Sequence, residues 1–112
     1  MEIKSNVFYM AQEKTVYICW EKINGISYVI KRTDYNGEIE IANSETSNFV
    51  RPYEFENDFN PYTELFRPAT RNWLYFKDNT VQDLQHYKYQ ILGEGGTTSE
   101  EYKSLPTEVY TE

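Results

Sequence analysis

Apolar and polar residues alternate along most of this chain, in short segments separated by turn residues. Segments 6–11, 15–20, 72–79 and 86–92 are rich in β-branched and aromatic residues. A period of two places successive side chains on opposite faces of a β-strand, whereas a helix repeats its apolar residues about every 3.6 positions. The pattern therefore predicts an all-β fold.

Segment 23–42 predicts a β-hairpin. Tyr28, Ile30 and Arg32 share one face of its first strand. The Asn-Gly pair at 36–37 predicts a type I′ turn, in which both central residues have positive φ. A last strand is expected at 107–112. The total of about seven strands, with turn residues between them, is typical of a β-sandwich.

The length and charge of the chain restrict its function. Its 112 residues are expected to form a single domain, 1–112, with one core. The net charge is −7 and the eleven Lys and Arg residues are scattered, whereas a protein that binds phosphates clusters them. No apolar run approaches the roughly 20 residues of a membrane span. Neither a nucleic acid nor a membrane is therefore an expected partner.

No catalytic set is visible in the sequence. Cys19 is the single cysteine and lies among apolar strand residues, so it is expected to be a buried small hydrophobic residue. The single histidine, His86, begins another strand. Without paired carboxylates or a Ser/His/Asp set, an enzyme is not expected, and neither is a cofactor.

The chain resembles a fibronectin type III domain, of the kind found in bacterial and phage proteins. Trp20 falls on the core tryptophan of that family, and Tyr28 and Ile30 fall on its Tyr-x-hydrophobic pair. The resemblance runs nearly end to end. It implies an immunoglobulin-like sandwich of about seven strands.

The same resemblance implies that the strand near residue 87 corresponds to strand F of the family. In the family a buried apolar residue precedes a tyrosine by six positions, and Val81 and Tyr87 keep that spacing. Tyr87 would be the tyrosine-corner residue, with its hydroxyl bonded to loop backbone. Tyr89 and Ile91 follow it on the inward face. The family usually has a Pro-Gly type turn at Leu84, so here this leucine is expected to cover the sandwich end.

The chain departs from the family in a long insert, 43–71, between strands C′ and E. Its segment 61–67 predicts one short helix, because Asn60 is a favourable N-cap and Pro61 suits the first helical position. The insert is rich in aromatic residues. One interpretation packs these rings over an open edge or end of the sandwich. The other leaves some of them exposed as a partner-binding patch, with these candidate residues: Phe55, Phe59, Tyr62, Phe66, Arg67 and Arg71.

Two further segments have weak site signals. Glu54, Glu56 and Asp58 offer oxygen ligands at alternate positions, but no calcium-loop pattern is present, so a solvated acidic stretch is favoured and no metal is expected. Segment 93–101 is glycine-rich but lacks the GK[ST] of a phosphate loop. It is expected to be a mobile loop, with Gly95 and Gly96 as hinges, and residues 93–99 are a second candidate contact region.

Two functions remain open. The first is a structural or binding module of a bacteriophage virion (capsid, tail or baseplate) or of a surface assembly, with a protein partner. The second is a small acidic inhibitor of a host enzyme, whose carboxylates mimic nucleic-acid phosphates. A carbohydrate is a further ligand class, but no residue pattern supports it. Because no signal peptide is visible, a virion or the host cytoplasm is the expected location. A fragment of a larger surface protein would be extracellular.

Overall fold

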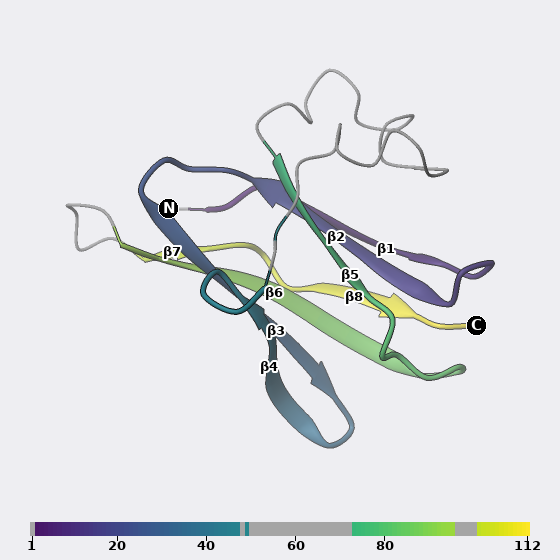
Figure 1. Ribbon diagram of the computed structural model, residues 1–112. Helices are drawn as coiled ribbons and strands as arrows, with labels where there is room; N and C mark the ends of the chain where they lie inside the picture. The colour runs from purple at the N-terminus through teal and green to yellow at the C-terminus, as the bar shows by residue number, and fades with distance from the viewer. Residues whose placement is uncertain (1, 48, 50–72, 96–100) are drawn as a thin grey trace.

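The computed structural model describes residues 2–47, 49, 73–95 and 101–112. Within these residues eight strands form two antiparallel sheets that pack face to face (Figure 1). The expected all-β sandwich is therefore confirmed at the level of two packed sheets. The predicted helix at 61–67 lies outside the described residues.

The smaller sheet has three strands in the order β1-β2-β5. They are β1 (Ser5–Met10), β2 (Thr15–Glu21) and β5 (Trp73–Asp78). The central strand, β2, is buried on both faces from Thr15 to Trp20. Its run of β-branched and aromatic residues suits such a position, because neither face has to meet water.

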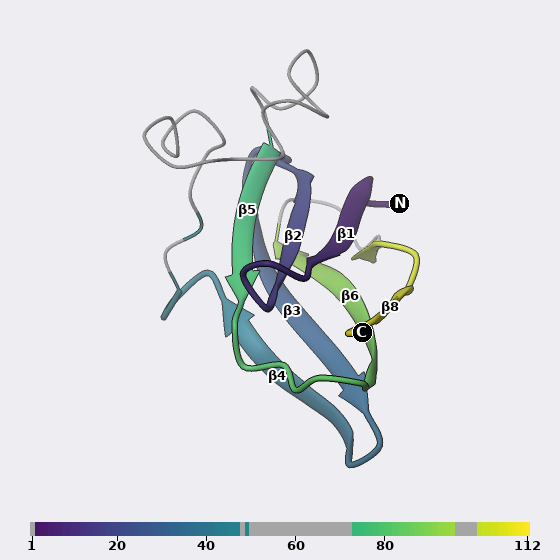
Figure 2. The same ribbon diagram turned by 90° about the vertical axis from the view of Figure 1, so that its right-hand side faces the viewer.

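The larger sheet has five strands. Its members are β3 (Ile26–Asp34), β4 (Gly37–Asn43), β6 (His86–Gly95), β7 (Tyr102–Lys103) and β8 (Thr107–Tyr110). The order is β4-β3-β6, and β7 and β8 then pair with successive parts of the long strand β6. Figure 2 shows the two layers from a second direction.

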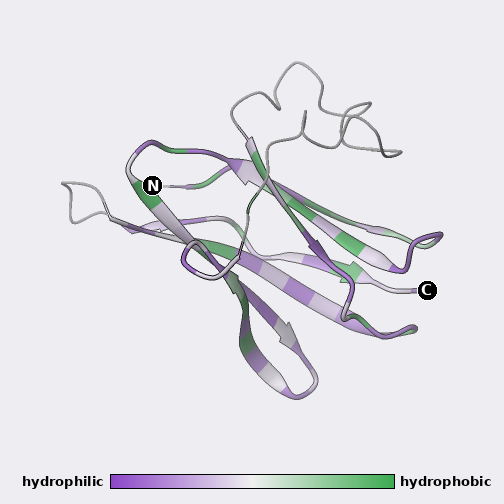
Figure 3. Cartoon of the chain, viewed as in Figure 1, coloured by the Kyte–Doolittle hydropathy of each residue, from purple (hydrophilic) through white to green (hydrophobic). Residues whose placement is uncertain are grey.

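The main core lies between the sheets. Val16, Ile18 and Trp20 point inward from β2 and meet inward side chains of the larger sheet. These are Tyr28, Ile30, Tyr87, Tyr89 and Ile91, each no more than 4% exposed. Val81 is half-buried and packs against this core. Figure 3 shows the alternation of hydrophobic and hydrophilic residues along the strands.

A second apolar cluster lies on the outer face of the smaller sheet. Tyr17, Cys19 and Tyr75 are buried there, and Phe8, Met10 and Trp73 pack against them. The outer face of a two-layer sandwich commonly meets water. Here it forms a second core instead, which explains why β2 has no polar face.

The β3–β4 turn differs from the type I′ prediction. Asp34 pairs with Gly37, so Tyr35 and Asn36 are the central residues, and neither has a positive φ. The Asp34 carboxylate accepts a hydrogen bond from the Asn36 N–H (2.8 Å), and Gly37 takes the positive φ one residue later (+114°). The type I′ prediction is wrong because the aspartate side chain stabilises a different turn.

The expected loop at 93–101 begins later than predicted. Gly93 and Gly95 belong to β6, where Gly95 pairs with Ile26, so Gly95 is a strand residue and no loop hinge. The two-residue strand β7 follows and was not expected. Residues 96–100 lie outside the described part of the chain.

Candidate functional site

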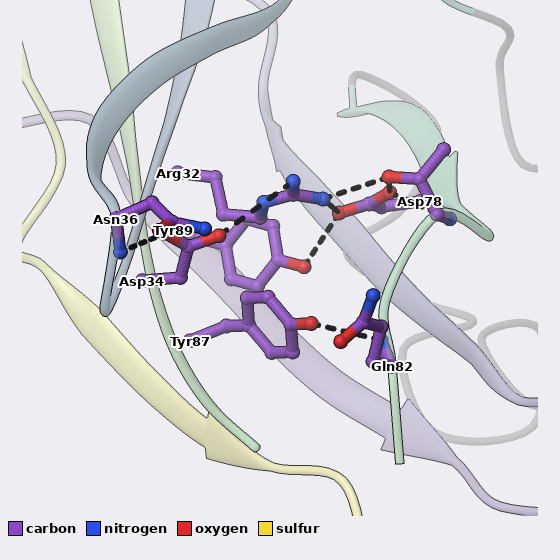
Figure 4. Close-up of polar contacts among 8 residues, drawn as sticks. Arg32, Asp34, Asn36, Asp78, Gln82, Tyr87 and Tyr89 are labelled. Carbon is purple, nitrogen blue, oxygen red and sulfur yellow. Dashed lines mark hydrogen bonds and ion pairs between the residues drawn. The ribbon is translucent and has the colours of Figure 1, made fainter.

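Three polar side chains from three strands meet inside the sandwich (Figure 4). Arg32 of β3 donates a hydrogen bond from Nη1 to Oδ2 of Asp78 (2.9 Å), the last residue of β5. The Tyr89 hydroxyl of β6 donates to the same oxygen (2.6 Å). Thr80 donates to the other carboxylate oxygen from both its N–H and its hydroxyl. The network joins the two sheets.

These residues point inward because successive side chains of a β-strand alternate between its two faces. Arg32 lies two and four residues after Ile30 and Tyr28 and therefore points inward, where it is 8% exposed. Asp78 pairs with Val16 and is 3% exposed. The shared face of Tyr28, Ile30 and Arg32 was predicted from sequence, but the partner of Arg32 was not. A charged residue at an inward position is the signal that could have pointed to a buried ion pair.

The network changes the pKa values of its members. Burial alone raises the pKa of Asp78, but hydrogen bonds from Thr80, Tyr89 and Arg32 outweigh it and hold that pKa below its usual range. For Tyr89, burial and then the nearby Asp78 charge raise the pKa of the phenol. Asp78 is therefore a carboxylate and Tyr89 a neutral donor at neutral pH. The network is enclosed, so its contribution is to hold the two sheets together.

Hydrogen bonds to the backbone of the β5–β6 loop hold this loop against the sandwich. The Tyr87 hydroxyl accepts a hydrogen bond from the Gln82 N–H (2.8 Å). Thr111 accepts the Leu84 N–H at its carbonyl and donates its own N–H to the Gln85 carbonyl (3.0 Å). The loop thus has a fixed path next to the C-terminal strand.

Leu84 is not where it was expected. Its φ of +58° lies in the left-handed region, and its side chain is 67% exposed. The expectation that Leu84 covers the sandwich end is wrong, because this backbone conformation turns the side chain toward solvent.

A pocket opens where the β3–β4 turn lies next to the start of β6. Its volume is about 340 Å³, and its lining includes Thr33, Asp34, Tyr35, His86, Lys88 and Glu108. The Tyr35 side chain is 73% exposed. The His86 ring stacks on Tyr110, with centroids 4.5 Å apart. Sequence reasoning did not assign this pocket, because its lining comes from the β3–β4 turn, β6 and β8.

The predicted partner-binding residues lie outside the described part of the chain. This holds for Phe55, Phe59, Tyr62, Phe66, Arg67 and Arg71, and for the acidic stretch at 54–60. Of the insert aromatics, Phe49 is described. It packs edge-on against Trp20, with centroids 4.9 Å apart, which agrees with the interpretation that insert rings cover the sandwich.

The two candidate reactive side chains, Cys19 and His86, lie in different environments. Burial raises the pKa of the Cys19 thiol to about 12, so it is not a nucleophile at neutral pH. His86 is exposed at the pocket. Across residues 2–47, 49, 73–95 and 101–112, no three His, Cys, Asp or Glu side chains gather as metal ligands. That same part of the chain holds no helix long and apolar enough to cross a membrane.

Comparison with known proteins identifies no family for this chain. The chain matches no protein-family model, and no curated protein sequence matches it.

Proposed function

We propose that this chain is a fibronectin type III-like sandwich that acts as a non-enzymatic binding module. Two observations support the fold type. The sheets have strand orders β1-β2-β5 and β4-β3-β6 with β8 beside β6, which suit the ABE and C′CFG sheets of that family. The Tyr87 hydroxyl bonds to backbone five residues upstream, as in a tyrosine corner.

One observation carries the binding role. Tyr35, Leu84 and Tyr110 are 73%, 67% and 42% exposed, and they come from the β3–β4 turn, the β5–β6 loop and the end of β8. The ionisable groups with strongly altered pKa values, in contrast, are sealed inside. Exposed apolar patches on a folded domain mark interaction sites, whereas perturbed groups in an open cleft mark catalysis. The surface therefore supports recognition of another protein.

The assembly we propose is a virion part (capsid, tail or baseplate) or a surface assembly, with the module in the particle or in the host cytoplasm. An acidic inhibitor of a host enzyme is the second candidate, and the net charge of −7 favours it. The aromatic surface favours the first, because a nucleic-acid mimic would present carboxylates in place of rings.

The size of the complex that contains the chain tests these two candidates. We would tag the chain in its source cells and separate the lysate, or the purified particles, on a density gradient. An assembly component travels with the particle at a fixed ratio to the major subunit. An inhibitor travels with one enzyme and blocks it. A chain that stays at the position of the free domain under all conditions would contradict both.

A further inference from the structure

The exposed side chains at the pocket end of the sandwich form one surface, which we call the sandwich-end surface and define as Tyr35, Leu84, His86 and Tyr110. The pocket connects them, since Tyr35 and His86 both line it. His86 stacks on Tyr110, and Leu84 precedes the pocket residue Gln85. Figure 1 shows the β3–β4 turn, the start of β6 and the C-terminus at this end.

Leu84 is the least expected member of this surface. A leucine in the left-handed region costs free energy that glycine or asparagine would avoid. Its side chain gains little from burial within the chain, because 67% of it is exposed. Asparagine at this position would suit both the backbone and the solvent. A strained, exposed leucine is an outlier that motivates the hypothesis of a contact outside the chain.

Carboxylates outnumber ammonium groups in the lining of the pocket. Asp34 and Glu108 line it together with Lys88, which lies opposite Glu108 in the β6–β8 register. Asp34 also lies 4.0 Å from the Arg32 guanidinium, whose main partner is Asp78 (2.9 Å). With a chain charge of −7, the long-range field also favours a basic partner.

We propose that the sandwich-end surface docks a protein partner through an arginine flanked by apolar side chains. The guanidinium enters the pocket, where the Tyr35 ring offers its face and Glu108 its carboxylate. The flanking apolar side chains cover Leu84 and Tyr110. Arginine suits the site better than lysine, since a planar guanidinium can stack and pair at once. This inference rests on the proposed binding role and names the surface and the chemistry of its partner.

The first experiment uses a defined probe. The peptide acetyl-Leu-Arg-Leu-amide is titrated into isotope-labelled protein, and the backbone amide shifts are followed by NMR at pH 7.5. We expect saturable shifts at Tyr35, Gln85, Lys88 and Glu108 that weaken as salt rises. The same peptide with citrulline, which is neutral and nearly isosteric, should produce much smaller shifts. Equal shifts with citrulline, or shifts confined to other residues, would overturn the proposal. Shifts here with the disaccharide cellobiose but not with the peptide would assign the pocket to a sugar.

The second experiment separates docking from stability with two variants. Leu84→Asn should keep or raise the melting temperature, because asparagine tolerates the left-handed region, and it should weaken peptide binding about fivefold. Glu108→Gln should weaken binding by a similar factor and remove most of its salt dependence. Leu105→Ser is the matched control, because Leu105 is 65% exposed but lies outside this surface. If both variants bind as the wild type does, the proposal fails.

The gradient experiment distinguishes this failure from failure of the binding role. Suppose that Leu84→Asn and Glu108→Gln chains still travel with the particle at the wild-type ratio. The module then binds through another region, such as the 43–71 insert, and only the sandwich-end surface is rejected. If the wild-type chain itself never joins a complex, the binding role is rejected.

Discussion

Asp78 is the residue on which the two sheets depend for their polar contact. Its carboxylate receives hydrogen bonds from Arg32, Tyr89 and Thr80, and it is 3% exposed. A buried ion pair does not by itself add much stability over an apolar pair, but the loss of one partner leaves the buried charge of the other poorly compensated. Without Asp78, Arg32 would keep Asp34 as an ion-pair partner at 4.0 Å. Loss of Asp78 alone should therefore destabilise the fold more than replacement of both Asp78 and Arg32 by apolar residues.

Asp78→Asn tests this dependence. We expect a loss of about 3–5 kcal/mol in the free energy of unfolding at pH 7, because the Arg32 charge stays buried. The pKa of Asp78 is lowered in the folded state, so its stabilisation is present above the unfolded pKa of about 3.9 and is lost as pH falls below it.

The difference between the wild type and Asp78→Asn should therefore shrink as the pH falls below about 4. Urea unfolding at pH 7 and at pH 3 measures it. Asp83→Asn is the control, because Asp83 forms an exposed ion pair with Lys14 and its loss should cost no more than about 1 kcal/mol. A pH-independent difference for Asp78→Asn would contradict this account.

Cys19 gives a second prediction at this scale. Its thiol is fully buried and its pKa is raised to about 12, so a disulfide-exchange reagent should modify it only after the chain opens. Labelling at pH 8 should be slow in the native protein and fast in concentrated urea. Fast labelling without denaturant would show that the second apolar cluster opens easily.

At the scale of elements, the contact between β3, β6 and β7 depends on Gly93. This residue pairs with Tyr28 on one side and Tyr102 on the other. A Cβ at this position would lie 2.8 Å from the Ile26 Cγ2 and 2.8 Å from the Tyr102 Cβ. The close packing of these strands is therefore possible only without a side chain here.

Gly93→Ala should destabilise the protein by about 1–3 kcal/mol, because the neighbouring side chains must move. Thermal unfolding measures the loss. Ile26→Ala removes one of the two clashes, so the double variant should lose less than the sum of the single variants. Strict additivity would show that the strain is relieved elsewhere.

At the scale of the whole molecule, Trp20 connects the sheets and the insert. Its ring contacts Tyr28 of the other sheet edge-on, with centroids 5.7 Å apart, and Phe49 at 4.9 Å. It is completely buried. The sandwich thus closes around one ring that three parts of the chain share.

Trp20→Ala should cost about 3–5 kcal/mol and lower the thermal midpoint by many degrees, because both sheets lose packing at once. Differential scanning calorimetry measures the midpoint. Trp73→Ala is the comparison, since Trp73 is half-buried on the outer face and should cost less. An unchanged midpoint in Trp20→Ala would mean that the two sheets do not depend on this ring.

Local sequence determined the strands and their inward faces. A period of two decides which side chains share a face, and so Tyr28, Ile30 and Arg32 could be grouped without knowledge of the fold. The inward position of Tyr87 and Tyr89 follows from the same alternation, and the Tyr87 hydroxyl accepts a hydrogen bond from the Gln82 N–H. The family resemblance that suggested a tyrosine corner there stays a prediction. These features depend on residues a few positions apart, which is why the sequence was enough.

Only the tertiary structure decided the features that depend on distant residues. Arg32 and Asp78 are 46 positions apart, and nothing local shows that one neutralises the other. The left-handed backbone that turns Leu84 outward lies in a loop that is held by Thr111 at the far end of the chain. The pocket needs the β3–β4 turn, β6 and β8 together. Alternation specifies which face of a strand a residue occupies, but the approach of separate strands decides what that residue meets.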